Sequence, residues 1–182
     1  MRQAVETIQA LMEVKPAIIA IDGPAGAGKS TLAEQLRQLF VDAEVYHMDD
    51  FFLTPVLRTP ERLARPGENV DHERFLNEVL LPLQRGKPFT YRRYDCQTGE
   101  FSPRSGEPAR LAIIEGSYSL HPSLRAYYDL KIFLDVDPQE QERRIRARSS
   151  EQMAQRFFTE WIPLEEAYFA HERLRETADL VL

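Results

Sequence analysis

Hydrophobic residues occur along this chain in short aliphatic or β-branched runs, most of them separated by segments with helical spacing. The runs are Ala17–Ile21, Val45–Met48, Leu111–Ile114, Leu130–Leu134 and Leu180–Leu182. Apolar runs of this length are typical of strands that are covered on both faces of a parallel sheet. The alternation therefore predicts an α/β protein with a doubly wound, five-stranded parallel sheet and helices on both faces.

Two segments between these runs show the signals of amphipathic helices. An apolar stripe predicts a helix over Leu32–Phe40. A second helix is expected over about Asp71–Gln84, because Asp71 is a good N-cap and Gly86 follows the last turn. Pro82 should distort that last turn.

The C-terminal third carries further helical signals. An Asp-Pro pair, a capping residue followed by a first-turn proline, starts a helix expected over about Asp137–Ser149. Apolar residues then recur at every fourth position over Met153–Trp161 until Pro163 interrupts the pattern. We expect a break or kink at this proline.

Two segments do not fit the alternation. Thr54–Val70 is rich in Pro, Arg and Glu, and Lys87–Pro108 carries short β-like pieces around a glycine. Both should lie near the carboxyl ends of strands, where open α/β sheets bind ligands. We interpret them as insertions that bind the substrate, the second of them as a small hairpin.

Composition and charge narrow the class of protein. The 182 residues are 43% hydrophobic, which predicts a single domain over 1–182 with a substantial core. No apolar run or N-terminal pattern predicts a membrane span or signal peptide, and the single cysteine, Cys96, cannot form an internal disulfide. A net charge of −6 argues against unspecific nucleic-acid binding. We therefore expect a soluble, cytoplasmic protein with no membrane or nucleic-acid partner.

A phosphate-binding motif follows the first predicted strand. The segment satisfies G-x-x-x-x-G-K-[ST] and opens the next helix; its residues are Gly23, Pro24, Ala25, Gly26, Ala27, Gly28, Lys29 and Ser30, with Thr31 next. Such a loop turns backbone N–H groups toward phosphates, while its lysine supplies charge and its serine binds Mg²⁺. The motif predicts ATP and Mg²⁺ as cofactors. The alternative is a glycine-rich turn with an exposed lysine.

Carboxylates follow two other predicted strands. Asp49 and Asp50 come after the second run, and Glu115 comes directly after Leu111–Ile114. All should reach the sheet edge that carries the phosphate-binding loop. Phosphoryl transfer needs one carboxylate to hold Mg²⁺ and another to accept the proton of the acceptor hydroxyl. We predict a metal site of Ser30, Asp49 and Glu115; the alternatives are a helix cap at the aspartates and a surface acid at Glu115.

Four arginines lie on the helix that begins after Asp137, namely Arg143, Arg144, Arg146 and Arg148. Pairs of the type Glu140–Arg144 and Glu142–Arg146 explain most of them as a solvated face. Arg148 has an arginine four residues upstream in place of an acid, which favours a phosphate partner for it. We predict that Arg144 and Arg148 bind ATP, and that a polar lid over 149–155 closes on it.

The histidines and the hairpin offer weaker signals. The four histidines and Cys96 lack the spacing of a zinc site. Asp71 and His72 begin a helix after a Pro-Gly loop. Two interpretations remain for this pair: capping of the helix by Asp71, or contact with a ligand. The cluster Arg92, Arg93, Tyr94 and Asp95 is either a lobe that reads hydroxyls and phosphates or a solvated hairpin.

Taken together, these motifs resemble the uridine kinase and phosphoribulokinase-like branch of P-loop kinases, from about Ala17 to Ser149. Met48–Phe52 is similar to the branch's Asp-x-Phe-aromatic segment, in which the first Asp is the catalytic base, so the resemblance implies that role for Asp49. Asn69–His72 resembles a segment whose Asp contacts the ribose of the acceptor. The resemblance thus implies acceptor contacts for Asp71 and His72.

The second half of the chain extends the resemblance. Tyr94-Asp95 is similar to the Tyr-Asp pair of the substrate-binding hairpin, which implies acceptor contacts for Arg93 and Tyr94. Ile114–Gly116 resembles the strand-end Glu-Gly of the metal site, and Ile132–Asp135 with the following arginines resembles the strand-helix-lid arrangement. One departure matters: Gly99 stands where uridine kinases usually have a base-reading histidine. We therefore expect a poor uridine kinase.

The leading hypothesis is a kinase that transfers the γ-phosphoryl group of ATP·Mg²⁺ to an alcohol of a nucleoside, sugar or related metabolite. Asp49 would deprotonate the alcohol, and Lys29 and Arg148 would neutralise developing charge. The alternatives are a nucleoside-monophosphate or pantothenate-type kinase, and a nucleotide-dependent regulatory ATPase without an acceptor. The sequence leaves open the acceptor, the choice of ATP or GTP, and the oligomeric state, a homo-oligomer being compatible with it.

Overall fold

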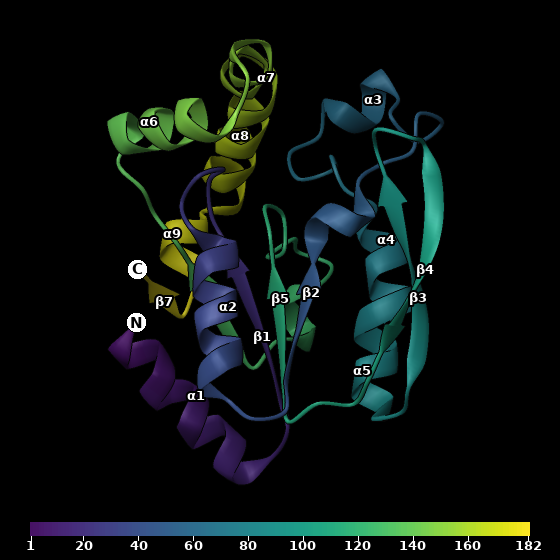
Figure 1. The fold of residues 1–182 in the computed structure, drawn as a ribbon, viewed down its shortest axis with the longest axis vertical. Helices are drawn as coiled ribbons and strands as arrows, with labels where there is room; N and C mark the ends of the chain where they lie inside the picture. The colour runs from purple at the N-terminus through teal and green to yellow at the C-terminus, as the bar shows by residue number, and fades with distance from the viewer.

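The computed structural model describes residues 1–182 and confirms the predicted parallel sheet (Figure 1). Its strands stand in the order β2–β5–β1–β6–β7, and each is parallel to its neighbours. They are β1 Ala17–Asp22, β2 Ala43–His47, β5 Leu111–Glu115, β6 Leu130–Phe133 and β7 Leu180–Val181. From the central β1 the chain passes to the edge strand β2, returns to β5 beside β1, and then crosses to β6 and β7 on the other side. Because strands are added on both sides of β1, the fold is doubly wound.

Helices cover both faces of the sheet, as predicted. The α-helices are α1 Arg2–Val14, α2 Lys29–Leu39, α3 Pro60–Leu63, α4 His72–Phe75, α5 Leu81–Arg85, α6 Pro138–Arg148, α7 Glu151–Arg156, α8 Ile162–Glu172 and α9 Leu174–Thr177. Short 3₁₀ segments are η1 Met48–Phe51 and η3 Arg125–Tyr127, and π segments are η2 Leu76–Leu80 and η4 Phe157–Trp161. None of the helices is long and apolar enough to cross a bilayer.

The core divides into two layers because successive side chains of a strand point to opposite faces. Ile19 and Ile21 of β1 pack in the layer that contains Ile8 of α1 and Leu36 of α2. Ala20, between them, packs in the layer that contains residues of α4, η2 and α8. The strands are thus apolar on both faces, which explains the uninterrupted runs in the sequence.

Helix α1 was not predicted. Its Ala4 and Ile8 are fully buried against the sheet, and Val5, Leu11 and Met12 pack around the same core layer. Apolar residues at these three- and four-residue spacings were the signal that would have identified it.

Two prolines act differently from the prediction. Pro82 lies in the first turn of α5, and the irregularity is the π segment η2 just before it. Pro163 does not break its helix: α7, the π segment η4 and α8 follow one another without a gap. A proline has no N–H to donate to the residue four positions earlier, and a wider π turn ahead of it absorbs that loss within the helix.

Both insertions contain regular structure. The second forms an antiparallel hairpin of β3 Phe89–Asp95 and β4 Glu100–Gly106, which lies beside α4 and α5 (Figure 1). The first contains α3, capped by the Thr59 side chain. Strand β2 ends at His47, in register with Glu115 of β5, so Met48 falls outside the strand predicted for it and begins η1.

Candidate active site

The phosphate-binding loop runs from Gly23 to Ser30, between β1 and α2, at the carboxyl end of the sheet (Figure 1). Gly23, Gly26 and Gly28 have φ values of 145°, 81° and 101°, which favour glycine. A Cβ on Gly23 would also lie 2.1 Å from the backbone oxygen of Leu134. The motif glycines are therefore required by the backbone path itself.

Lys29 folds back into this loop. Its Nζ donates to the carbonyl oxygens of Gly23 at 2.7 Å and Pro24 at 3.0 Å, and it lies 3.3 Å from Ser117 Oγ. These contacts place one positive charge at the mouth of a loop built for anions.

Glu115, Ser30 and His47 form a connected group at the ends of β5, α2 and β2. Ser30 Oγ donates to Glu115 Oε2 at 3.1 Å, and His47 Nδ1 lies 2.5 Å from Glu115 Oε1. The hydrogen bond to the buried Glu115 raises the pKa of His47. The sequence pattern did not identify His47 as a site residue, although its position at the end of a strand was a usable signal.

The predicted metal ligands fit a magnesium ion by their donor type. Ser30 and Glu115 offer a hydroxyl and a carboxylate oxygen within 3.1 Å of each other, and Asp49 lies close enough to feel the charge of Glu115. Mg²⁺ prefers hard oxygen donors of this kind. In nucleotide sites it commonly takes only one or two of them from the protein and the others from the phosphates and water.

Asp49 and Asp50 sit on η1, directly after β2. Asp49 is open to solvent on one side but crowded by protein on the other; this desolvation and the charge of Glu115 raise its pKa. Asp50 is the more enclosed of the two and pairs with Arg93 Nε at 3.3 Å. The two aspartates therefore have different environments: Asp49 is open to solvent, whereas Asp50 is held by an arginine.

Two buried carboxylates next to the loop were missed. Asp22, at the end of β1, accepts from the N–H groups of Gly23 and Leu120 at 2.7 and 2.8 Å and from the Tyr168 hydroxyl at 3.0 Å. Complete burial raises its pKa to about 6, although these donors and Lys29 oppose the shift. It ties the start of the loop to the segment after β5.

Glu165 of α8 is the second buried carboxylate next to the loop. It accepts from the N–H of Ala25 at 2.9 Å and from Ser117 Oγ at 2.6 Å. Burial raises its pKa, and Lys29 opposes that shift. The contact joins the phosphate-binding loop to a residue 140 positions further along the chain, which sequence spacing cannot reveal.

The arginines of α6 form the predicted ion pairs with glutamates, except for Arg148. Arg143 and Arg144 pair with Glu140, and Arg146 pairs with Glu142 and Glu151. Arg144 also donates to the carbonyl oxygens of Gly26 and Ala27, so it lies against the phosphate-binding loop.

Arg148 forms no ion pair, and its guanidinium lies 5.6 Å from the Phe157 ring centroid. The predicted lid over 149–155 is the capping pair Ser149-Ser150 and the start of α7. Its Ala154 packs with Ala25 and Ile145. The nucleotide contacts of Arg144 and Arg148 and the closing of the lid stay predictions.

Asp71 caps α4 by accepting from the N–H of Arg74 at 3.0 Å. His72 is buried: its ring stacks on His121 at 3.8 Å, and both Nδ1 atoms contact Ser123 Oγ. Glu68 completes a cluster that could in principle hold a metal ion. Arg62 and Arg65 pair with Glu68, however, and Ser123 Oγ already contacts the Nδ1 atoms of both rings. We interpret this cluster as a structural network, and acceptor contacts of Asp71 and His72 stay predictions.

Arg92 and Arg93 are neighbours in β3, so their side chains point to opposite faces of the hairpin. Arg93 faces Asp50, whereas Arg92 pairs with Glu78 on the other side and is not available as an acceptor contact. Tyr94 is buried against Phe101. Gly99 has a φ of 75° in the hairpin turn, which gives a structural reason for glycine where a histidine was expected.

Comparison with known proteins identifies the family of this chain. The model of the phosphoribulokinase / uridine kinase family matches residues 18–156. A uridine kinase of Geobacillus kaustophilus is 30% identical over 138 residues, 70% of this chain and 64% of that protein. The bifunctional alpha-galactosidase/sucrose kinase AgaSK of Mediterraneibacter gnavus is 30% identical over 192 aligned positions, 91% of this chain and 20% of that protein.

The fold has close counterparts among solved structures. A candidate fructose transport system kinase from Silicibacter sp. TM1040 superposes with a TM-score of 0.72 at 26% identity, over 96% of both chains. The chain spans less than two thirds of the length of both curated relatives above. The matched region nevertheless includes the phosphate-binding loop, η1, the hairpin and α6. The chain belongs to the phosphoribulokinase / uridine kinase family, and it has the α/β fold of the P-loop kinases.

Proposed function

We propose that this protein is an ATP- and Mg²⁺-dependent kinase that phosphorylates a hydroxyl group of a small, neutral, polyhydroxylated molecule, a carbohydrate in preference to uridine. The observation that carries the proposal is the convergence of Lys29, Ser30, Glu115 and Asp49 at one sheet edge. A bare ATPase would not need a carboxylate placed to accept a proton from an acceptor.

Asp49 is the proposed general base. Its raised pKa makes it a stronger base than a solvated aspartate, and its open side leaves room for the acceptor hydroxyl. Its proton acceptance would accompany attack of the hydroxyl oxygen on the γ-phosphorus, with ADP as the leaving group.

The positive groups act on the phosphates. Lys29 already lies in the loop, Arg144 lies against it, and Arg148 is the α6 arginine without an acidic partner. We propose that Lys29 and Arg148 neutralise charge that develops on the transferred group. Ser30, Glu115 and Asp49 would hold magnesium, which screens the phosphate oxygens and favours departure of ADP.

A carbohydrate acceptor is favoured by three observations. Gly99 has a positive φ, which favours glycine in the hairpin turn, and it supplies no side chain to read a base. Arg93 is held near Asp50, so the hairpin offers a charged, hydroxyl-binding edge to this side of the site. Two proteins with high coverage of this chain are described as a bifunctional alpha-galactosidase/sucrose kinase and as a candidate fructose transport system kinase.

The test is ADP release measured over a panel of acceptors at fixed ATP and Mg²⁺. The panel contains D-fructose, sucrose, other sugars and polyols, uridine, cytidine, pantothenate and nucleoside monophosphates. We expect the highest kcat/KM with a sugar and product that carries the phosphoryl group on that sugar. A clear preference for uridine or cytidine would overturn the acceptor assignment. ADP release that no acceptor accelerates would instead identify a regulatory ATPase.

A further inference from the structure

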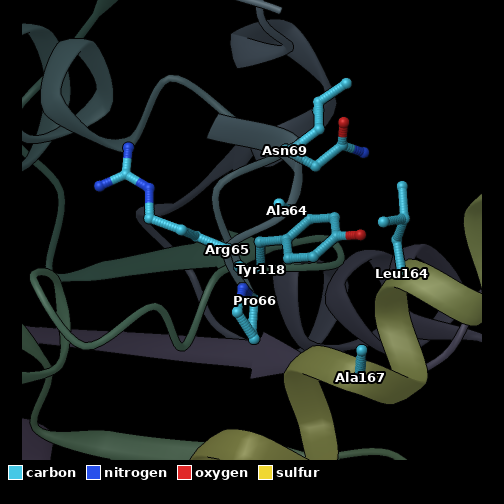
Figure 2. Close-up of a pocket in the computed structure, with 9 residues that line it drawn as sticks. Ala64, Arg65, Pro66, Asn69, Tyr118, Leu164 and Ala167 are labelled. Carbon is cyan, nitrogen blue, oxygen red and sulfur yellow. The ribbon is translucent and has the colours of Figure 1, made fainter. Parts of the chain in front are cut away.

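A cavity of about 70 Å³ lies between the segment 63–69, the residues after β5 and helix α8 (Figure 2). Leu63, Ala64, Leu164 and Ala167 give it mostly apolar walls. Its buried polar side chains are Asn69, from the first insertion, and Tyr118, from the segment after β5.

Both polar side chains are buried and lack partners. Asn69 is 7% exposed and Tyr118 is 2% exposed, and neither Asn69 Oδ1 nor the Tyr118 hydroxyl makes a hydrogen bond of normal geometry. The two side chains are neighbours, because the Asn69 amide opposes the rise that burial causes in the pKa of Tyr118. Figure 2 shows the Tyr118 hydroxyl pointing into the space toward Leu164. Buried polar atoms are nearly always paired, so two of them beside one cavity indicate a missing polar occupant.

The protein holds both side chains in place through their backbones. Tyr118 adopts a left-handed conformation with a φ of 73°, and its N–H donates to Asp22 Oδ1 at 3.2 Å. On the other side, Arg62 binds the carbonyl oxygens of Glu68 and Val70, which flank Asn69, at 3.2 and 3.0 Å. Strained backbone conformations of this kind are retained mainly at functional sites.

Two lining residues of the cavity are connected to the phosphate-binding loop. Tyr118 shares Asp22 with the N–H of Gly23, and the preceding Ser117 contacts Lys29. On the opposite wall, Leu164 precedes Glu165, which binds the N–H of Ala25. The walls of the cavity are therefore joined on two sides to the proposed phosphate site.

The chemistry of the walls indicates a neutral, hydroxylated group. The one charged lining residue is Arg65, whose guanidinium points away from the Tyr118 hydroxyl in Figure 2 and lies 3.8 Å from Glu68. An anionic occupant would thus lack a counter-charge. A planar base needs more room, since about 150 Å³ accommodates benzene.

We propose that this cavity is an acceptor subsite for the hydroxyl-bearing carbon end of a sugar, with Tyr118 Oη and Asn69 Oδ1 as its hydrogen-bond partners. The inference rests on the proposed function and extends it to a second contact region, away from the hairpin.

The test uses Tyr118→Phe, which removes only the hydroxyl, and Tyr128→Phe as a matched control. The Tyr128 hydroxyl is also buried without a partner, but Tyr128 does not line this cavity. Calorimetric binding of D-fructose and of sucrose is measured for the full chain with ADP and Mg²⁺ present. For a sugar that the wild type binds, we expect Tyr118→Phe to raise Kd about three- to tenfold, the value of one neutral hydrogen bond. Tyr128→Phe should leave Kd unchanged.

Deoxy analogues of the sugar that binds identify which of its hydroxyl groups Tyr118 contacts. The analogue that lacks the hydroxyl held by Tyr118 should bind wild type and Tyr118→Phe equally, so the two changes are not additive. Equal Kd values for wild type and Tyr118→Phe with the parent sugar, or no binding of either sugar to the wild type, would overturn the subsite. Sugar turnover that Tyr118→Phe leaves unchanged would overturn the subsite but not the kinase. Sugar binding that Tyr118→Phe weakens, without phosphorylation, would support the subsite and refute the acceptor assignment.

Discussion

His47 and Glu115 stand in register on the adjacent parallel strands β2 and β5, with His47 Nδ1 2.5 Å from Glu115 Oε1. The other carboxylate oxygen of Glu115 accepts from Ser30 Oγ. The imidazole thus fixes the orientation of a carboxylate that points at the first turn of α2. Outer partners of this type commonly orient metal ligands.

This pair predicts a specific pH dependence. The hydrogen bond to Glu115 raises the pKa of His47 in the folded chain above its unfolded value of about 6.5. The pair therefore contributes stability below pH 6.5, and this contribution is lost as pH rises through the raised pKa. Glu115→Gln should lower the pKa of His47, measured by NMR titration of its ring. An identical His47 titration in both proteins would contradict the assignment.

The two neighbouring aspartates should differ in their effect on catalysis. Asp49→Asn should lower kcat by roughly 10²–10⁴-fold with little change in ATP binding, because a general base acts only on the reacting hydroxyl. Asp50→Asn should be milder, since Asp50 pairs with Arg93. Steady-state kinetics with the preferred acceptor, together with calorimetric ATP binding, separate the two. If Asp50→Asn proved the more damaging, the base would be misplaced by one residue.

Lys29→Ala should reduce phosphoryl transfer by at least about 10²-fold, because it removes a preorganised charge from the phosphate site. The fold should persist, since Lys29 contacts loop carbonyls and no core side chain. A coupled ADP assay with a thermal melt measures both effects, and the exposed Lys87→Ala serves as the control. Turnover close to that of the wild type would refute the phosphate-site assignment.

Arg148 and Arg143 offer a comparison on one helix. Arg143 is paired with Glu140, whereas Arg148 has no acidic partner. Arg148→Ala should lower kcat by about 10²-fold or more, as expected for an arginine that stabilises the transferred phosphoryl group. Arg143→Ala should leave kcat unchanged. Equal kinetics for the two variants would show that Arg148 belongs to the solvated face.

Much of the fold followed from local pattern. The buried strands, the Asp137 cap of α6 and the glycines of the phosphate-binding loop are signals carried by neighbouring residues, and the structure confirms each of them. The two prolines were misjudged for a local reason as well, since a π turn can accommodate a missing N–H inside a helix that tertiary contacts stabilise.

The site could be predicted only in part. Lys29, Ser30, Asp49 and Glu115 are placed by strand ends, because parallel strands bring their carboxyl ends to one edge. His47 also stands at such an end, but its role depends on the register between β2 and β5, which pattern does not specify. The stacking of His72 on His121 depends in the same way on packing.

The sequence by itself determined the class of fold, the phosphate-binding loop and the family, since each rests on short segments whose residue types act locally. Only the tertiary structure decided that Glu165 holds the loop, that Arg92 turns away from the site, and that Asn69 and Tyr118 meet at one cavity. These relationships join residues separated by up to 140 positions. They arise from the burial of side chains against partners that no local spacing encodes.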